Sequence, residues 1–123
     1  MGAAPPALDP QVLDSLEALG GSGFVAGLVQ DFLRDSEQSL RALEAAAGAA
    51  DVSRFRAEAH AMRSSAANIG AKAVWGACRA AETLPAAEVR DAGARQAGAI
   101  RAELERVKAA WGALAGANNL GSP

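Results

Sequence analysis

The sequence predicts an all-α protein, and three observations support this fold class. Of the 123 residues, 33 are alanine, the strongest helix former, whereas only ten are β-branched and none is tyrosine. Apolar residues recur at intervals of three and four along most of the chain. A glycine or a proline stands at each break in this pattern. We therefore expect an antiparallel up-down-up-down four-helix bundle with a short additional N-terminal helix.

A glycine pair separates the first two expected helices. Asp9 followed by Pro10 has the form of an N-cap with proline at the first helical position, and the helical spacing continues until Gly20 and Gly21. A second helix is expected to start after Ser22 and to end at about residue 47. Its apolar side carries Phe24, Leu28, Phe32, Leu40 and Leu43. Because the first helix is short, we expect it to lie across one end of the bundle.

Three further helices follow in the same way. One starts after the cap Asp51 and ends before Gly70, and its apolar stripe is the cleanest in the chain: Val52, Phe55, Ala59, Met62, Ala66 and Ile69. The next is expected over residues 71–84, with Pro85 ending it. The last carries Val89, Ile100, Leu104, Val107, Trp111 and Leu114. The short loops between these helices predict that consecutive helices are antiparallel.

Length, charge and cysteine content limit the number of domains, the classes of partner and the location that we expect for this chain. The chain is long enough for one domain, which we place at residues 9–115, with flexible flanks at 1–8 and 116–123. The formal net charge is −2 and the basic residues are scattered, so we expect neither nucleic-acid binding nor membrane insertion. A single cysteine and the lack of a signal-like segment favour a reducing, cytoplasmic location. We expect a monomer.

His60 is the only histidine in the chain. A lone histidine on a helix is more often packed or idle, but this one lies roughly 130° around the helix from the apolar stripe, so its ring is expected to face solvent. Arg56, Arg63 and Ser64 lie one turn away from it. Small neighbours let a partner come close, and guanidinium groups can share the negative charge of a phosphoryl group. The pattern indicates docking and anion handling.

The run AHAMRSSAANIGA at residues 59–71, with Cys78 and Glu82 beyond it, resembles the signature of histidine phosphotransfer (HPt) domains. That signature reads roughly A-H-x-L-K-G-S-S, then an apolar residue and G-A, then C and L-E. The resemblance is specific over residues 59–82, and the helical layout extends it loosely to almost the whole chain. It implies a four-helix bundle whose exposed histidine accepts a phosphoryl group from a receiver-domain aspartyl phosphate and passes it to another receiver.

Residue by residue, the resemblance makes His60 the phosphoacceptor and Arg63 the counterpart of the usual lysine beside the phosphoryl group. Glu82 falls on an acidic or amide position, from which it can accept a hydrogen bond from the other ring nitrogen and fix the tautomer. The chain departs from the family at Met62, Arg63, Ser64 and Ala81. Of these, Ser64 replaces a glycine and adds bulk where the receiver approaches, which puts the transfer rate and partner choice in doubt.

The implied activity requires few chemical groups from this chain. A neutral imidazole attacks the phosphorus, and we expect the receiver to supply Mg²⁺, because no carboxylates cluster around His60. We expect no cofactor or metal of its own, no ATP-binding loop and no kinase activity. The expected partners are response-regulator receiver domains and a hybrid sensor histidine kinase.

Three alternatives stay open. The dimerisation domain of a histidine kinase also carries a helical histidine, but an acidic residue normally follows it, and here Ala61 does. A non-catalytic helical module that binds receivers but has lost phosphotransfer would have Ser64 blocking the approach. A hydrolase using Cys78 and His60 is the enzymatic alternative, although Cys78 lies on the apolar side of its helix.

Other large or charged residues are given structural roles. We interpret Trp75 and Trp111 as core or interface residues, and Lys72, Arg79 and Arg90 as a solvated face.

Overall fold

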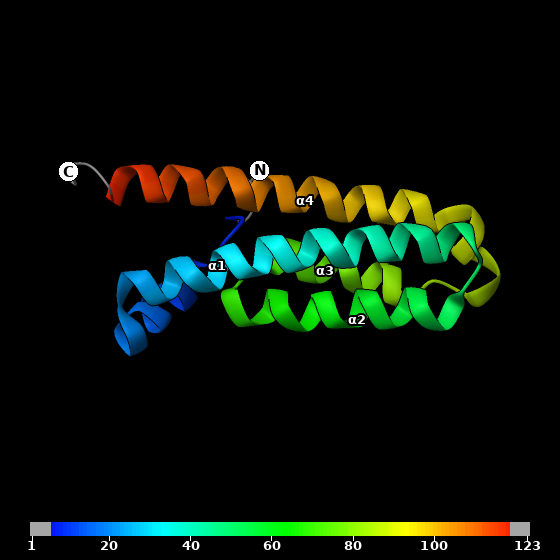
Figure 1. Ribbon diagram of the computed structural model, residues 1–123, viewed down its shortest axis with the longest axis horizontal. Helices are drawn as coiled ribbons and strands as arrows, with labels where there is room; N and C mark the ends of the chain where they lie inside the picture. The colour runs from blue at the N-terminus through cyan, green and yellow to red at the C-terminus, as the bar shows by residue number, and fades with distance from the viewer. Residues whose placement is uncertain (1–5, 119–123) are drawn as a thin grey trace, which may run out of the picture.

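The computed structural model describes residues 6–118, and these form an antiparallel helical bundle (Figure 1). Its elements are α1 (Pro10–Gly48), α2 (Val52–Ile69), α3 (Lys72–Glu82), the 3₁₀ turn η1 (Ala86–Glu88) and α4 (Val89–Asn118). Helices α1 and α3 each pack against both α2 and α4, which closes the bundle. No strand occurs in the range described. The predicted all-α fold class is confirmed.

Helix α1 consists of two helical pieces that meet at Gly21. This residue has φ +87° and ψ 175°, a conformation that glycine adopts without steric cost. The chain changes direction there, and the N-terminal piece turns back at one end of the bundle (Figure 1). The short additional helix expected from the Gly20-Gly21 pair is therefore present.

The start of α1 is tied to the corner between α2 and α3. Asp9 caps the helix by accepting a hydrogen bond from the Gln11 backbone N–H at 2.9 Å. Its own N–H donates to the carbonyl of Gly70 at 2.9 Å, and its carboxylate lies 2.9 Å from Lys72 Nζ. Because Gly70 ends α2 with φ +74°, the same residue both terminates one helix and receives the beginning of another.

Helix α3 is shorter than expected. The sequence suggested a helix over residues 71–84, but α3 spans only Lys72–Glu82. Thr83 follows the last residue of this helix, and its hydroxyl donates to the carbonyl of Arg79 at 2.9 Å, where it competes with the helical hydrogen bond from its own backbone N–H. Pro85 then disfavours helical geometry at Leu84 and leads into η1. The bundle consequently has three long helices and one short one, and Glu82 lies at the end of the short one.

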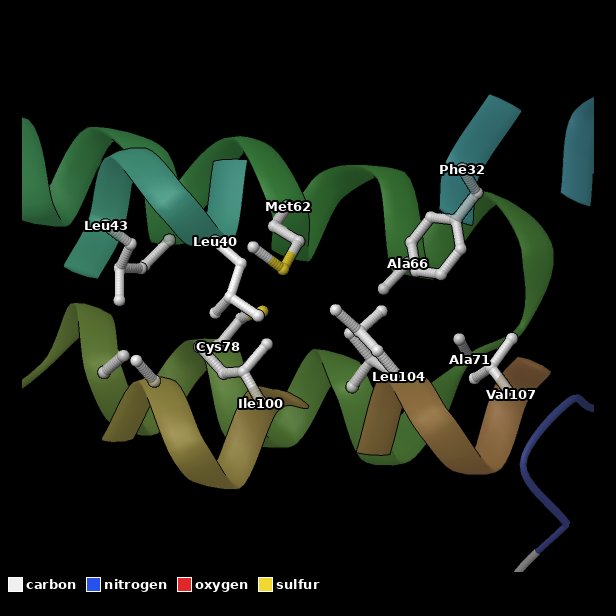
Figure 2. Close-up of a cluster of buried hydrophobic side chains, with 14 of the residues drawn as sticks. Phe32, Leu40, Leu43, Met62, Ala66, Ala71, Cys78, Ile100, Leu104 and Val107 are labelled. Atoms are coloured by element: carbon white, nitrogen blue, oxygen red, sulfur yellow. The ribbon is translucent and has the colours of Figure 1, made fainter. Parts of the chain in front are cut away.

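The core is a narrow strip along the bundle axis (Figure 2). Leucine, methionine and isoleucine side chains from α1, α2 and α4 fill it together with Val74 and Cys78 of α3, and alanines between them let the helices approach closely. One such close approach is at Gly93 on α4, where an added Cβ would lie 2.6 Å from the Cβ of Ala47 on α1. Ala7 and Leu8 are also buried in this core.

The buried residues and the helix bounds extend slightly past both ends of the body expected at residues 9–115. The packed body begins at Ala7 rather than at residue 9, because Ala7 and Leu8 cover the core next to the start of α1. Helix α4 continues to Asn118, beyond the expected limit at residue 115. The outermost parts of the expected flanks, residues 1–5 and 119–123, lie outside the described residues.

By length and composition alone, α1 is apolar enough to cross a membrane. The sequence analysis did not anticipate this property. The break at Gly21 interrupts the helix, however, and Phe32, Leu40 and Leu43 in its C-terminal part are buried in the bundle. Only 11% of the apolar stretch itself is buried, and one such helix is weak evidence for a membrane span. Its N-terminal part does leave Leu19 and Phe24 exposed.

Candidate functional site

His60 lies near the middle of α2, on the side that faces away from the core. Its neighbours Phe55, Ala59 and Met62 are buried, whereas 57% of the His60 side chain is exposed. The helical period that buries the stripe turns the ring outward, as expected from the sequence.

The His60 ring contacts the last residue of α3. Its Nδ1 lies 2.8 Å from Oε2 of Glu82, whose side chain is 23% exposed. An ionised carboxylate can only accept hydrogen bonds, so we assign the proton of the neutral ring to Nδ1. The lone pair is then on Nε2. Glu82 thus lies where the resemblance placed it, and it orients a nucleophilic nitrogen away from itself.

Arg63 binds the other oxygen of the same carboxylate. Its Nε is 3.1 Å from Glu82 Oε1, and its Nη2 is 3.0 Å from His60 Nδ1. A guanidinium only donates, and in the assigned tautomer Nδ1 also donates, so the second contact is proximity rather than a hydrogen bond. The carboxylate of Glu82 therefore bridges the two side chains. Arg63 lies on the Nδ1 side of the ring.

Two guanidinium groups lie over the indole of Trp75. The Cζ atoms of Arg63 and Arg79 are 5.7 Å and 5.5 Å from its ring centroid, within the range of cation–π interactions. This contact was not expected from the sequence. The spacing of Trp75 and Arg79, four residues apart on one helix, could have indicated half of it. The contact between Arg63 and Trp75 depends on how α2 packs against α3.

The structure does not bring Arg56 to the ring. Its Nη2 instead donates to the backbone carbonyl of Leu84 at 2.9 Å, where it satisfies a group just beyond the end of α3. Only one of the two expected guanidinium groups therefore flanks His60. Ser64 lies one turn beyond His60 on the same face and is exposed.

Cys78 cannot act as a nucleophile with His60 in this fold. Its side chain is fully buried, and burial raises the pKa of the thiol to about 12. The nearby Arg63 guanidinium lowers this pKa slightly and Glu82 raises it further, but desolvation dominates. The thiol stays protonated at physiological pH, which removes the hydrolase alternative. Within residues 6–118, no group of three or more His, Cys, Asp and Glu side chains could hold a metal.

Comparison with known proteins agrees with the helical bundle. The family model of the Hpt domain matches residues 27–110, which include His60 and Glu82. The chain belongs to the Hpt domain family. Its general role is therefore histidine phosphotransfer in two-component phosphorelay signalling.

A solved structure gives the same result. The fold is similar to the crystal structure of histidine-containing phosphotransfer protein B (HptB) from Pseudomonas aeruginosa PAO1, with a TM-score of 0.72 and 29% sequence identity. The match covers 85% of this chain and 90% of that chain. No curated protein sequence gives a significant match.

Proposed function

We propose that this Hpt domain is a phosphorelay carrier that accepts a phosphoryl group on Nε2 of His60 from a receiver-domain aspartyl phosphate and passes it to another receiver. The observation that carries the proposal is the 2.8 Å contact between His60 Nδ1 and Glu82 Oε2 beneath a ring that is 57% exposed. This contact leaves Nε2 unprotonated and open to a partner.

The transfer step uses few groups of this chain. The Nε2 lone pair forms a bond to phosphorus while the bond from phosphorus to the aspartyl oxygen breaks, and the aspartate leaves as a carboxylate. The ring becomes positively charged and keeps its proton on Nδ1, where Glu82 stabilises the charge. In the second step, an aspartate of another receiver attacks the phosphorus and the neutral imidazole leaves. Mg²⁺ belongs to the receiver.

In this proposal Arg63 acts through Glu82 rather than directly on the phosphoryl group. It lies on the Nδ1 side, 3.1 Å from Glu82 Oε1, so it holds the carboxylate in the position that fixes the tautomer. The usual lysine of the family is expected beside the phosphoryl group instead. The difference follows from the shape of the side chain, because a planar guanidinium binds a carboxylate well.

The surface beside His60 suits a receiver domain. Beyond Ser64, a hollow of about 450 Å³ is lined by Val12 of α1, Ala66, Ala67 and Gly70 of α2, and Lys72 and Trp75 of α3. This hollow lies next to the histidine face, and a receiver placed on His60 would cover it. We propose receiver domains and a hybrid sensor histidine kinase as partners, and a monomeric, cytoplasmic protein without ATP-dependent activity.

The test is intact-mass spectrometry after the protein is mixed with a phosphorylated receiver domain. A single acid-labile phosphoryl group on the wild type and none on His60→Gln is the expected result. Glu82→Gln keeps an acceptor oxygen but loses the charge, and it should slow transfer about 3- to 10-fold, because charge-assisted hydrogen bonds are about twice as strong.

Two outcomes would overturn the proposal. An adduct that persists in His60→Gln would place the phosphoryl group on another residue. A stable complex with receivers but no adduct on the wild type would make the chain a receiver-binding module, with Ser64 blocking close approach.

A further inference from the structure

Trp75 does not contact His60, but two charged side chains lie over its ring. It lies on α3, is partly buried and packs against the core, so its indole is held in place by the fold. Two guanidinium groups lie over this ring, those of Arg63 and Arg79. The ring therefore offers a fixed surface to side chains that otherwise have many conformations.

The two arginines differ in what else they contact. Arg63 reaches Glu82 with its Nε, whereas Arg79 has no ion pair with any residue that the structure describes. A continuous line of contacts consequently leads from Trp75 through Arg63 and Glu82 to His60. Each step is short enough to restrict the next side chain.

The contacts from Trp75 to His60 matter because an arginine side chain is long and flexible. An arginine side chain loses considerable rotamer freedom when it is held in one conformation, and a surface ion pair alone often fails to offset that loss. Only 25% of the Arg63 side chain is exposed, which shows how closely it lies against its neighbours. Stacking on the indole favours the same conformation that places Nε against Glu82.

We propose that Trp75 is a positioning residue for the His60 ring, acting through Arg63 and Glu82. By holding Arg63 Nε on Oε1, Trp75 keeps Oε2 of Glu82 oriented toward Nδ1. The ionised carboxylate at 2.8 Å outweighs the Arg63 Nη2 donor at 3.0 Å from the same nitrogen, and so the proton stays on Nδ1. Loss of the indole frees Arg63, loosens Glu82 and lets the neutral ring place its proton on Nε2 for part of the time. A ring with its proton on Nε2 has no lone pair for the phosphoryl group at the exposed position.

This inference rests on the proposed function for its consequence, but the positioning itself can be measured without any phosphotransfer. His60 is the only histidine, so ¹⁵N-histidine labelling gives a single pair of ring-nitrogen resonances. Their chemical shifts report which nitrogen carries the proton when the ring is neutral. We expect the wild type to show a protonated Nδ1 and Trp75→Leu to show a measurable shift toward the Nε2-protonated form.

The matched control is Arg79→Met. It removes a guanidinium from over the same indole but touches neither Glu82 nor His60 in the contacts described, so the ring resonances should stay as in the wild type. Trp75→Phe keeps an aromatic face in a similar volume and should restore most of the wild-type tautomer. Thermal unfolding of Trp75→Leu checks that the bundle is intact. If the leucine variant fails to fold, Arg63→Met keeps the test decisive, because it removes the guanidinium that the indole holds and should shift the ring resonances in the same direction.

A double-mutant cycle shows whether Trp75 acts through Arg63. The rate of phosphorylation by a phosphorylated receiver should fall about 3- to 10-fold in Trp75→Leu, the size expected from one cation–π contact. Arg63→Met should fall by at least as much, and Trp75→Leu added to Arg63→Met should cause little further loss. Equal and independent losses in the double variant would overturn the proposal.

The two proposals fail in different ways. Ring resonances that do not change in Trp75→Leu would refute the positioning role, even if His60 is phosphorylated normally. Resonances that shift in Trp75→Leu but not in Arg79→Met support the positioning role even if no receiver phosphorylates the wild type, which would count against the proposed function alone.

Discussion

Gly70 is the residue at which one small substitution should cost the most. It ends α2 with φ +74° and ψ 26°, in the left-handed region. An added Cβ would lie 2.9 Å from the Cβ of Asp9 and 2.9 Å from the Cβ of Val12. Both neighbours are the first atoms of their side chains, so rotation about a side-chain bond cannot move them away. Relief requires the start of α1 to shift.

The expected cost of Gly70→Ala has two parts. A residue other than glycine in the left-handed region costs about 1–2 kcal/mol. Forcing an extra methyl group into a close contact adds about 1–3 kcal/mol. The sum is about 2–5 kcal/mol, which corresponds to a fall in Tm of about 8–20 °C at roughly 4 °C per kcal/mol for a domain of this size.

The assay is thermal and urea unfolding, with Gly76→Ala as the matched control. Gly76 lies on α3, and an added Cβ would meet no atom within 4 Å, so alanine there should stabilise the protein by about 1 kcal/mol. Hydrogen exchange adds a local readout, because the Asp9 N–H, bonded to the Gly70 carbonyl, should lose protection in Gly70→Ala. A Tm equal to or above that of the wild type would refute the reasoning.

Three further predictions concern other parts of the fold. Gly93→Ala should lower the free energy of unfolding by about 1–3 kcal/mol, because its Cβ would lie 2.6 Å from that of Ala47; an unchanged urea midpoint would contradict this. The Cys78 thiol, buried and with its pKa raised to about 12, should resist Ellman's reagent in the native protein and react after unfolding in urea; rapid labelling of the native protein would count against its burial. The hydrogen bond from Lys72, followed by the backbone N–H of Gln11, lowers the pKa of Asp9 below its ordinary 3.8. The stability that this carboxylate contributes is therefore present above pH 3.8 and is lost as the pH falls through the lower folded value, so wild type and Asp9→Asn should differ in urea unfolding at neutral pH and converge in acid; a difference independent of pH would disprove it.

Much of the fold could be predicted because its signals are local. Asp9 and Asp51 mark helix starts because their side chains accept hydrogen bonds from backbone N–H groups two or three residues later. Gly21 and Gly70 mark a break and a helix end because their backbones adopt positive φ. The wrong expectation for the C-terminal end of α3 has a local cause as well. The hydroxyl of Thr83 competes for the carbonyl of Arg79, and α3 ends at Glu82, two residues before the expected end at Leu84.

The outward orientation of His60 could also be derived from the sequence. A period of 3.6 residues relates every position on a helix to its apolar stripe, so the face that carries His60 and Ser64 follows once the stripe is identified. The signature at residues 59–82 added the family, and it placed Glu82 near the ring.

The identity of the groups around the ring was decided by packing between helices. Arg56 and Arg63 each lie about one helical turn from His60 in the sequence, yet Arg56 binds the carbonyl of Leu84, and Arg63 lies against Glu82 and Trp75. Which of the two arginines lies beside the His60 ring depends on where α3 ends and on which face of α3 packs against α2.

The sequence by itself thus determined the helices, their breaks, the exposed face of α2 and the family signature, because these depend on residues within one or two turns of each other. Only the tertiary structure decided which oxygen of Glu82 meets Nδ1, which arginine joins it, and that Trp75 lies beneath that arginine. Those contacts join residues 12 to 22 positions apart on two helices, and a rotamer at such a distance depends on the spacing and rotation of the packed helices.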